Sequence, residues 1–230
     1  MAMCSRFASV AGGCLRQPVA GRGMMRHVRS VFMTVGLLSL LVCGGLLMAW
    51  TGRGPAAQTP LPVFGDVPAF SLINQSGVLV DRDALRGSVW IAEFIFTRCA
   101  GQCPLMAERL AELQRHFARE PRVRFVSITV DPAHDTPEAL TAYARRYHAD
   151  LARWSFLTGE AAAIQTLAQE GFRLGLSDGG SAREPIIHSV KLVLVDQAGR
   201  IRGYYGAMEA RAVERLNTEV AALVRAAHAP

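Results

Sequence analysis

A nearly continuous apolar run, Val89–Phe96, leads directly into two cysteines, Cys99 and Cys103, which Pro104 follows. Such a run is typical of a strand that is covered on both faces and therefore lies in the middle of a sheet. We expect Pro104 to open a helix, because proline is favoured at the first helical position. The two thiols are thus predicted at a strand-to-helix turn, a position that suits redox chemistry or a soft metal ion.

The rest of the chain predicts strands that alternate with helices. An N-terminal hairpin is expected at 72–80, with Gln75-Ser76-Gly77 at its tip. This alternation predicts an α/β fold, a thioredoxin-like mixed sheet flanked by helices, with the hairpin and the segment 154–185 as additions. The other expected strands are 123–130, 154–157, 190–195 and 201–205, and the expected helices are 104–119, 137–147, 160–169 and 209–227.

A stretch without charged residues, 31–50, precedes this domain. About 20 helical residues span the roughly 30 Å of a bilayer core. Because residues 1–30 contain arginines and no acidic residue, the positive-inside rule keeps them in the cytoplasm and exports the part of the chain after residue 50. We therefore predict a basic cytoplasmic segment at 1–30, a transmembrane anchor at 31–50, a linker at 51–62 and a folded domain at 63–230.

This organisation predicts a single-pass protein of a bacterial inner membrane, with its C-terminal domain in the periplasm. The mitochondrial inner membrane is the second choice. A cleaved signal peptide, a lipoprotein signal around Cys43 and an organelle transit peptide remain alternatives for the apolar stretch, and Met24 or Met25 could be the true start. The net charge of +6 owes much to the N-terminal arginines, and no basic–aromatic interleaving occurs, so nucleic-acid binding is excluded as a function.

The spacing of the cysteines favours two sulfurs that converge on one ion. Pro104 predicts Cys103 as the N-cap of the helix, where the helix dipole would lower the pKa of its thiol. His188, just before the strand at 190–195, is the candidate third ligand. Two thiolates and one imidazole suit copper, above all Cu(I), whereas zinc generally takes four ligands. The alternatives are a structural disulfide between Cys99 and Cys103 and a purely structural His188.

Three motifs in this order resemble the Sco/SenC family of membrane-anchored copper proteins that help to assemble cytochrome c oxidase. They are Phe-Thr-Arg-Cys-Ala-Gly-Gln-Cys-Pro at 96–104, Asp-Pro-Ala-His-Asp-Thr-Pro at 131–137, and His188-Ser189. The resemblance implies a thioredoxin-like fold, with Cys99, Cys103 and His188 as ligands of Cu(I), Cu(II) or both. It also implies action on the dinuclear copper site of oxidase subunit II.

The chain departs from the family pattern at two places. The family usually has proline after its first cysteine and an acid between the two cysteines, where this chain has the neutral residues 100–102. It also commonly has aspartate before the histidine, where this chain has Ile187. These changes leave the three expected ligands in place but alter their surroundings, so another copper-accepting client is an alternative to subunit II.

Two functions arise as hypotheses. The first is a metallochaperone that passes copper by ligand exchange. The second is a thiol–disulfide oxidoreductase, in which Cys99 and Cys103 form the catalytic redox pair and keep an acceptor's cysteines reduced without a need for His188. Around the site, we expect Asp131 as a turn residue, and Asp135 or Thr136 as the cap of the helix that begins at Pro137. His134 is expected to be exposed and Met106 to pack in the core.

Overall fold

The computed structural model describes residues 24–51, 60–181, 184–188 and 190–226. Contacts divide the chain into two units, Met1–Thr59 and Pro60–Pro230. The first contains helix α1, Met24–Thr51. Within the described ranges, no helix combines the length and the apolarity that a membrane crossing requires. The anchor predicted at 31–50 is thus unconfirmed.

The second unit is built on one large mixed sheet with the strand order β1-β10-β9-β4-β5-β6-β2-β3. β4, β5 and β6 run parallel, and the remaining pairs are antiparallel. Every residue of β4 is buried, as predicted for a central strand. The strands are β1 Gly65–Asp66, β2 Ser71–Asn74, β3 Leu79–Asp81, β4 Val89–Ile95, β5 Val123–Thr129, β6 Trp154–Thr158, β9 Lys191–Val195 and β10 Arg200–Gly206.

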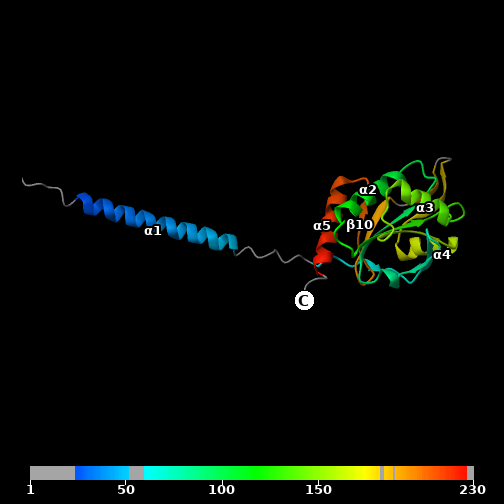
Figure 1. Ribbon diagram of the computed structural model, residues 1–230, viewed down its shortest axis with the longest axis horizontal. Coiled ribbons are helices and arrows are strands. Elements are labelled where there is room, and N and C mark those ends of the chain that lie inside the picture. The colour runs from blue at the N-terminus through cyan, green and yellow to red at the C-terminus, as the bar shows by residue number, and fades with distance from the viewer. Residues whose placement is uncertain (1–23, 52–59, 182–183, 189, 227–230) are drawn as a thin grey trace, which may run out of the picture. The chain divides into compact units, whose positions relative to one another are not determined.

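Helices cover both faces of this sheet (Figure 1). Because side chains alternate along a strand, Ile91 and Ile95 face a core shared with α2, α3 and α5. Trp90 and Phe94 face the opposite core, which α4 and the π-helical turn after it complete. The helices are η1 Asp83–Leu85, α2 Cys103–His116, α3 Pro137–Arg146, α4 Ala161–Thr166, the π-helix η2 Leu167–Gly171 and α5 Ala210–Ala226.

Both predicted hairpins are confirmed. β2 and β3 pair around the tip Gln75-Ser76-Gly77, where Asn74 Oδ1 accepts the backbone N–H groups of Ser76 and Val78. Gly77 has a φ of 74°, a left-handed conformation that glycine adopts without strain. At the other end of the chain, β9 and β10 form the predicted antiparallel pair. The mixed α/β architecture predicted from the alternating pattern is therefore present.

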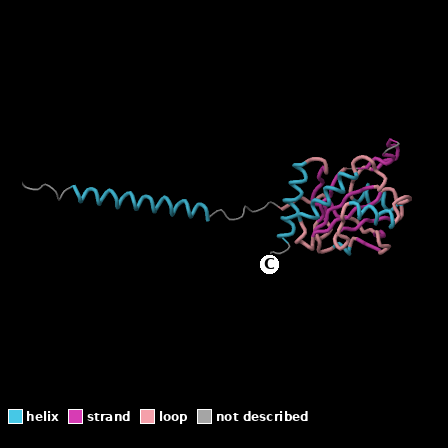
Figure 2. Tube along the Cα trace, turned by 45° about the horizontal axis from the view of Figure 1, so that its top comes forward, coloured by secondary structure: helices cyan, strands magenta, loops and turns pink. Residues whose placement is uncertain are grey.

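The segment 154–185 differs most from its prediction. The helix expected at 160–169 is a short α4, which ends in a π turn where the N–H of Phe172 donates to the carbonyl of Leu167 at 2.9 Å. After it, β7 (Leu176–Ser181) and β8 (Glu184–His188) form a separate two-stranded sheet that was not predicted. Figure 2 shows this hairpin projecting from the rest of the unit. His188, which was expected just before the strand at 190–195, is therefore the last residue of another strand, β8.

Candidate metal centre

The thiol turn follows β4 directly, but its helix begins earlier than predicted. The N–H of Cys99 donates to the carbonyl of Phe96 at 3.2 Å, which closes the turn. Gln102 is the N-cap of α2, because it precedes the first helical residue and its carbonyl accepts the N–H of Met106 at 3.0 Å. The prediction of Cys103 as the N-cap is thus wrong. Cys103 is the first residue of the helix, and Pro104 lies within the first turn.

The two cysteine side chains lie together in a buried position. Cys99 is 7% exposed and Cys103 is 0% exposed. Burial raises the pKa of the Cys103 thiol, and a hydrogen bond with the Cys99 side chain raises it further, while a hydrogen bond with the backbone of Phe96 opposes both effects. The predicted fall in the pKa of Cys103 is therefore wrong for the metal-free protein, because the loss of hydration outweighs the helix dipole.

Asp135 ties the thiol turn to the loop after β5. Its buried carboxylate accepts the backbone N–H of Thr97 at 3.0 Å and the Thr97 hydroxyl at 2.5 Å, and it also accepts the hydroxyl of Thr129. The helix cap is its neighbour Thr136, whose Oγ1 accepts the N–H of Ala139 at 3.3 Å. Thr136 is thus the cap, as one of the two alternatives predicted. Asp135, the other alternative, does not cap the helix but holds Thr97, which lies two positions before Cys99. The sequence alone did not assign it this contact.

Three polar residues, Arg98, Asp131 and His134, form a hydrogen-bonded cluster beside the thiol turn. Arg98, the residue before Cys99, donates to Asp131 Oδ2 at 2.7 Å, and His134 Nδ1 lies 2.8 Å from Asp131 Oδ1. Burial alone would raise the pKa of Asp131, but hydrogen bonds from Arg98 and His134 outweigh burial and lower it. The side chains of Arg98 and His134 are exposed, as was expected for His134. The motif at 131–137 therefore supports the thiol turn through both of its aspartates.

Glu93 is a buried acid that the sequence analysis overlooked. It lies on β4, where Ser127 Oγ donates to its Oε1 at 2.7 Å and Trp154 Nε1 donates to Ser127 Oγ at 2.9 Å. Burial raises the pKa of Glu93 to about 8, and the Ser127 hydrogen bond only partly opposes this rise. The signal was available in the sequence, because Glu93 is the only charged residue within the apolar run 89–96.

The structure brings two of the three predicted ligands together. Cys99 and Cys103 are in contact, whereas the imidazole of His188 lies outside the described side chains, so its role stays a prediction. Among the side chains that are described, no group of three His, Cys, Asp or Glu is placed to hold a metal ion. Met106 packs in the core, as predicted. Two adjacent thiols suit a soft metal ion as donors.

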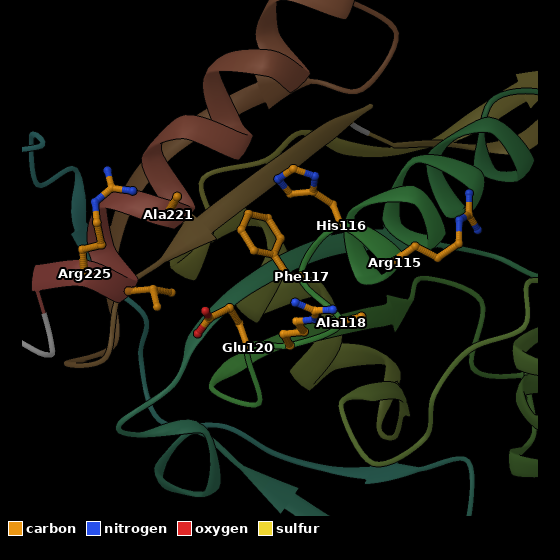
Figure 3. A pocket seen from close by; sticks show the side chains of 9 residues that line it. Arg115, His116, Phe117, Ala118, Glu120, Ala221 and Arg225 are labelled. Carbon is orange, nitrogen blue, oxygen red and sulfur yellow. The ribbon is translucent and has the colours of Figure 1, made fainter.

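A separate hollow of about 360 Å³ lies at the other end of α2. Figure 3 shows His116 and Phe117, at the end of α2, facing Ala221 and Arg225 of α5 across it. The 14 residues of α2 place this hollow roughly 20 Å from Cys103, at about 1.5 Å per residue. It is therefore not part of the thiol site.

Comparison with known proteins gives consistent matches. The family model described as SCO1/SenC matches residues 64–225. The SCO1 protein homolog of Bacillus subtilis is 32% identical over 179 residues, which are 77% of this chain and 88% of that protein. Among solved structures, BsSco has a TM-score of 0.64 at 29% identity, and the match covers 72% of this chain and 98% of BsSco. BsSco is described as a member of the Sco family of cytochrome c oxidase assembly proteins that has a disulfide switch. Arabidopsis thaliana ScoI with copper bound has a TM-score of 0.59 at 25% identity, and the match covers 69% of this chain and 98% of that chain.

The family match spans the sheet, the thiol turn, the loop at 131–137 and the strand that ends at His188. It includes all three motifs that the sequence analysis singled out. The chain belongs to the SCO1/SenC family.

Proposed function

We propose that this chain is a membrane-anchored copper-binding protein that delivers copper to the dinuclear site of cytochrome c oxidase subunit II or to another copper acceptor. The observation that carries the proposal is the pair of buried, mutually contacting thiols of Cys99 and Cys103 at the start of α2. Two adjacent thiols supply two soft donors, which suit Cu(I). Related proteins are described as copper-bound and as oxidase assembly proteins.

His188 is the proposed third ligand. The register pairs Ala92 of β4 with Val193 of β9, and these strands are antiparallel, so β9 begins beside the end of β4 that leads into the thiol turn. His188 precedes Lys191, the first residue of β9, by only a few residues. An extended chain covers at most about 3.6 Å per residue, so the backbone of His188 lies within about 11 Å of Lys191. This placement supports an imidazole ligand supplied from the β7–β8 hairpin.

Anaerobic Cu(I) titration of the full chain against a chromogenic chelator tests the proposal. We expect about one Cu(I) per chain, loss of binding in the double variant Cys99→Ser/Cys103→Ser, and at least about tenfold weaker binding in His188→Ala. His116→Ala is the matched control, because His116 is an exposed histidine at the far end of α2. Unchanged Cu(I) binding in the double cysteine variant would refute the proposal.

Thiol–disulfide exchange is the second candidate function. The contact between the two thiols favours it, as does the disulfide switch described for the related BsSco. An oxidoreductase needs the cysteine pair but not the histidine. A His188→Ala variant that reduces an acceptor dithiol peptide at the full wild-type rate, while Cys99→Ser and Cys103→Ser do not, would favour this function. Its reduction potential should then lie above about −300 mV, because structural disulfides lie below that value.

The membrane anchor and the periplasmic location belong to the same proposal. The uncharged stretch 31–50 and the basic residues before it support an anchor with the domain exported. Within α1, large apolar side chains such as Phe32 and Leu40 are exposed, which a lipid environment would cover. Fractionation tests this. The full chain should stay in membranes after alkaline washing, and a variant lacking residues 1–50 should be released. A full chain recovered in the soluble fraction would contradict the anchor.

A further inference from the structure

Glu93 is a carboxyl group placed where a charge is costly. It is 0% exposed, and among the described residues it is the only acid whose buried side chain has an oxygen without a hydrogen-bond partner, Oε2. The hydrogen-bond chain that the described residues make to its carboxyl is uncharged. Ser127 of β5 donates its one hydrogen bond, and Trp154 of β6 donates to Ser127. Among the described residues, a negative charge here is therefore shielded from water and stabilised by the Ser127 hydrogen bond alone.

Glu93 lies between Ile91 and Ile95 on the same face of β4, so it faces the core that also contains Cys103 and Tyr143. On α3, the hydroxyl of Tyr143 donates to the carbonyl of Cys103 at 3.4 Å. Burial raises the pKa of this tyrosine most, and a charge on Glu93 is the next cause of the rise. Burial is the main cause that raises the pKa of Tyr147, the C-cap residue of α3, and a charge on Glu93 adds a small rise. On α2, burial is the main cause that raises the pKa of Cys103, and a charge on Glu93 adds a smaller rise. A negative charge on the carboxyl and a negative charge on the thiol pair thus oppose each other across a region with little water to screen them.

We propose that the protonation of Glu93 is coupled to copper loading of the thiol pair, so that the loaded protein holds Glu93 neutral. This inference rests on the proposed binding of Cu(I) by Cys99 and Cys103. Each protonated thiol loses its proton when its sulfur bonds to Cu(I), and a site with two thiolates and one Cu(I) carries a net charge of −1. That charge favours the neutral form of Glu93.

The proton balance depends on the state of Glu93 before loading. Where Glu93 is already neutral, loading releases the thiol protons alone. Where Glu93 is ionised before loading, it takes up one proton, so net release falls by up to one proton per copper. Because burial raises the pKa of Glu93 to about 8, the decrease in net proton release occurs at alkaline pH and disappears near pH 6. Glu93 thus influences the copper site through its charge and does not contact the metal.

The test counts the protons released per Cu(I) by calorimetry in buffers of different ionisation enthalpy, from pH 6 to pH 9.5, on the full chain. Glu93→Gln, which is always neutral, should match wild type at pH 6 and release up to one proton more per copper above pH 8. The ratio of its Cu(I) affinity to that of wild type should rise by up to tenfold per pH unit there. Glu120→Gln is the matched control, because Glu120 follows the far end of α2.

Equal proton counts and a constant affinity ratio at every pH would overturn the coupling while leaving copper binding intact. A wild-type chain that binds no Cu(I) would overturn the proposed function and the coupling with it. If the Glu93→Gln variant does not fold, a second measurement on the wild-type protein tests the coupling. In wild-type protein labelled with ¹³C at the glutamate carboxyls, the Glu93 resonance should titrate at higher pH after copper loading. An unchanged midpoint would overturn the coupling.

Discussion

Replacing Glu93 with glutamine should remove a large pH dependence from the stability of the metal-free protein. Burial raises the pKa of Glu93 from 4.5 to about 8 in the folded chain. Below pH 4.5 the group is neutral in both the folded and the unfolded state, so it costs nothing. Between pH 4.5 and 8 the unfolded chain ionises Glu93 and the folded chain does not, so the free energy of unfolding falls as pH rises. Above pH 8 the loss is complete.

The size of this loss is set by the same values. Each pH unit over which only the unfolded state is ionised costs about 1.4 kcal/mol, which gives a total of about 5 kcal/mol for Glu93. Glutamine has no such dependence, because it is neutral in both states. Its amide leaves buried N–H groups to satisfy, so we expect Glu93→Gln to be less stable than wild type at pH 5 by about 1–3 kcal/mol.

Urea unfolding of the metal-free full chain at pH 5, 7 and 9 measures the effect. The wild-type free energy of unfolding should fall across this range by several kcal/mol more than that of Glu93→Gln, so that the two stabilities converge or cross. Glu120→Gln should keep the wild-type slope. Parallel pH profiles for wild type and Glu93→Gln would show that Glu93 ionises normally in the folded state and would refute the reasoning.

Three further substitutions test individual contacts of the domain by urea unfolding. Asp135→Ala removes the acceptor of Thr97 and Thr129 and should cost about 3 kcal/mol, because it leaves the buried Thr129 hydroxyl and the part-buried Thr97 donors unpaired; a loss below about 1 kcal/mol would contradict this contact. Thr136→Ala should cost about 1 kcal/mol through the lost cap of α3, and Thr136→Ser should restore it. Gly171→Ala should cost about 1–3 kcal/mol, because its Cβ would lie 2.9 Å from the ring of Pro68; a neutral effect would show that the ring can move.

Hydrophobic patterns were sufficient to predict the layout of the domain. The apolar run at 89–96 predicts a central strand, and β4 is buried along its whole length. The helical spacing after Pro104 predicts α2, and the turn residues predict both hairpins. The β7–β8 hairpin was missed because Ser177-Asp178-Gly179-Gly180-Ser181 has none of the alternating apolar residues that indicate a strand.

The sequence predicts the proximity of the two thiols but not the pKa of Cys103. Their proximity is predicted by spacing, but the pKa of Cys103 depends on how many atoms cover it, which only the packed core decides. Asp135 reaches Thr97 because β4 and β5 are parallel neighbours and end at the same edge of the sheet. No local pattern encodes that pairing. Glu93 is different, since an acid within an apolar strand is visible in the sequence itself.

X-ray absorption at the copper edge of the Cu(I)-loaded full chain identifies the ligand atoms of the proposed copper site. We expect two sulfur ligands and one imidazole nitrogen in wild type, the loss of the imidazole signal in His188→Ala, and an unchanged spectrum in His116→Ala. Copper bound without sulfur, or a spectrum that replacement of Cys99 and Cys103 by serine leaves unchanged, would contradict a copper site built on the thiol turn.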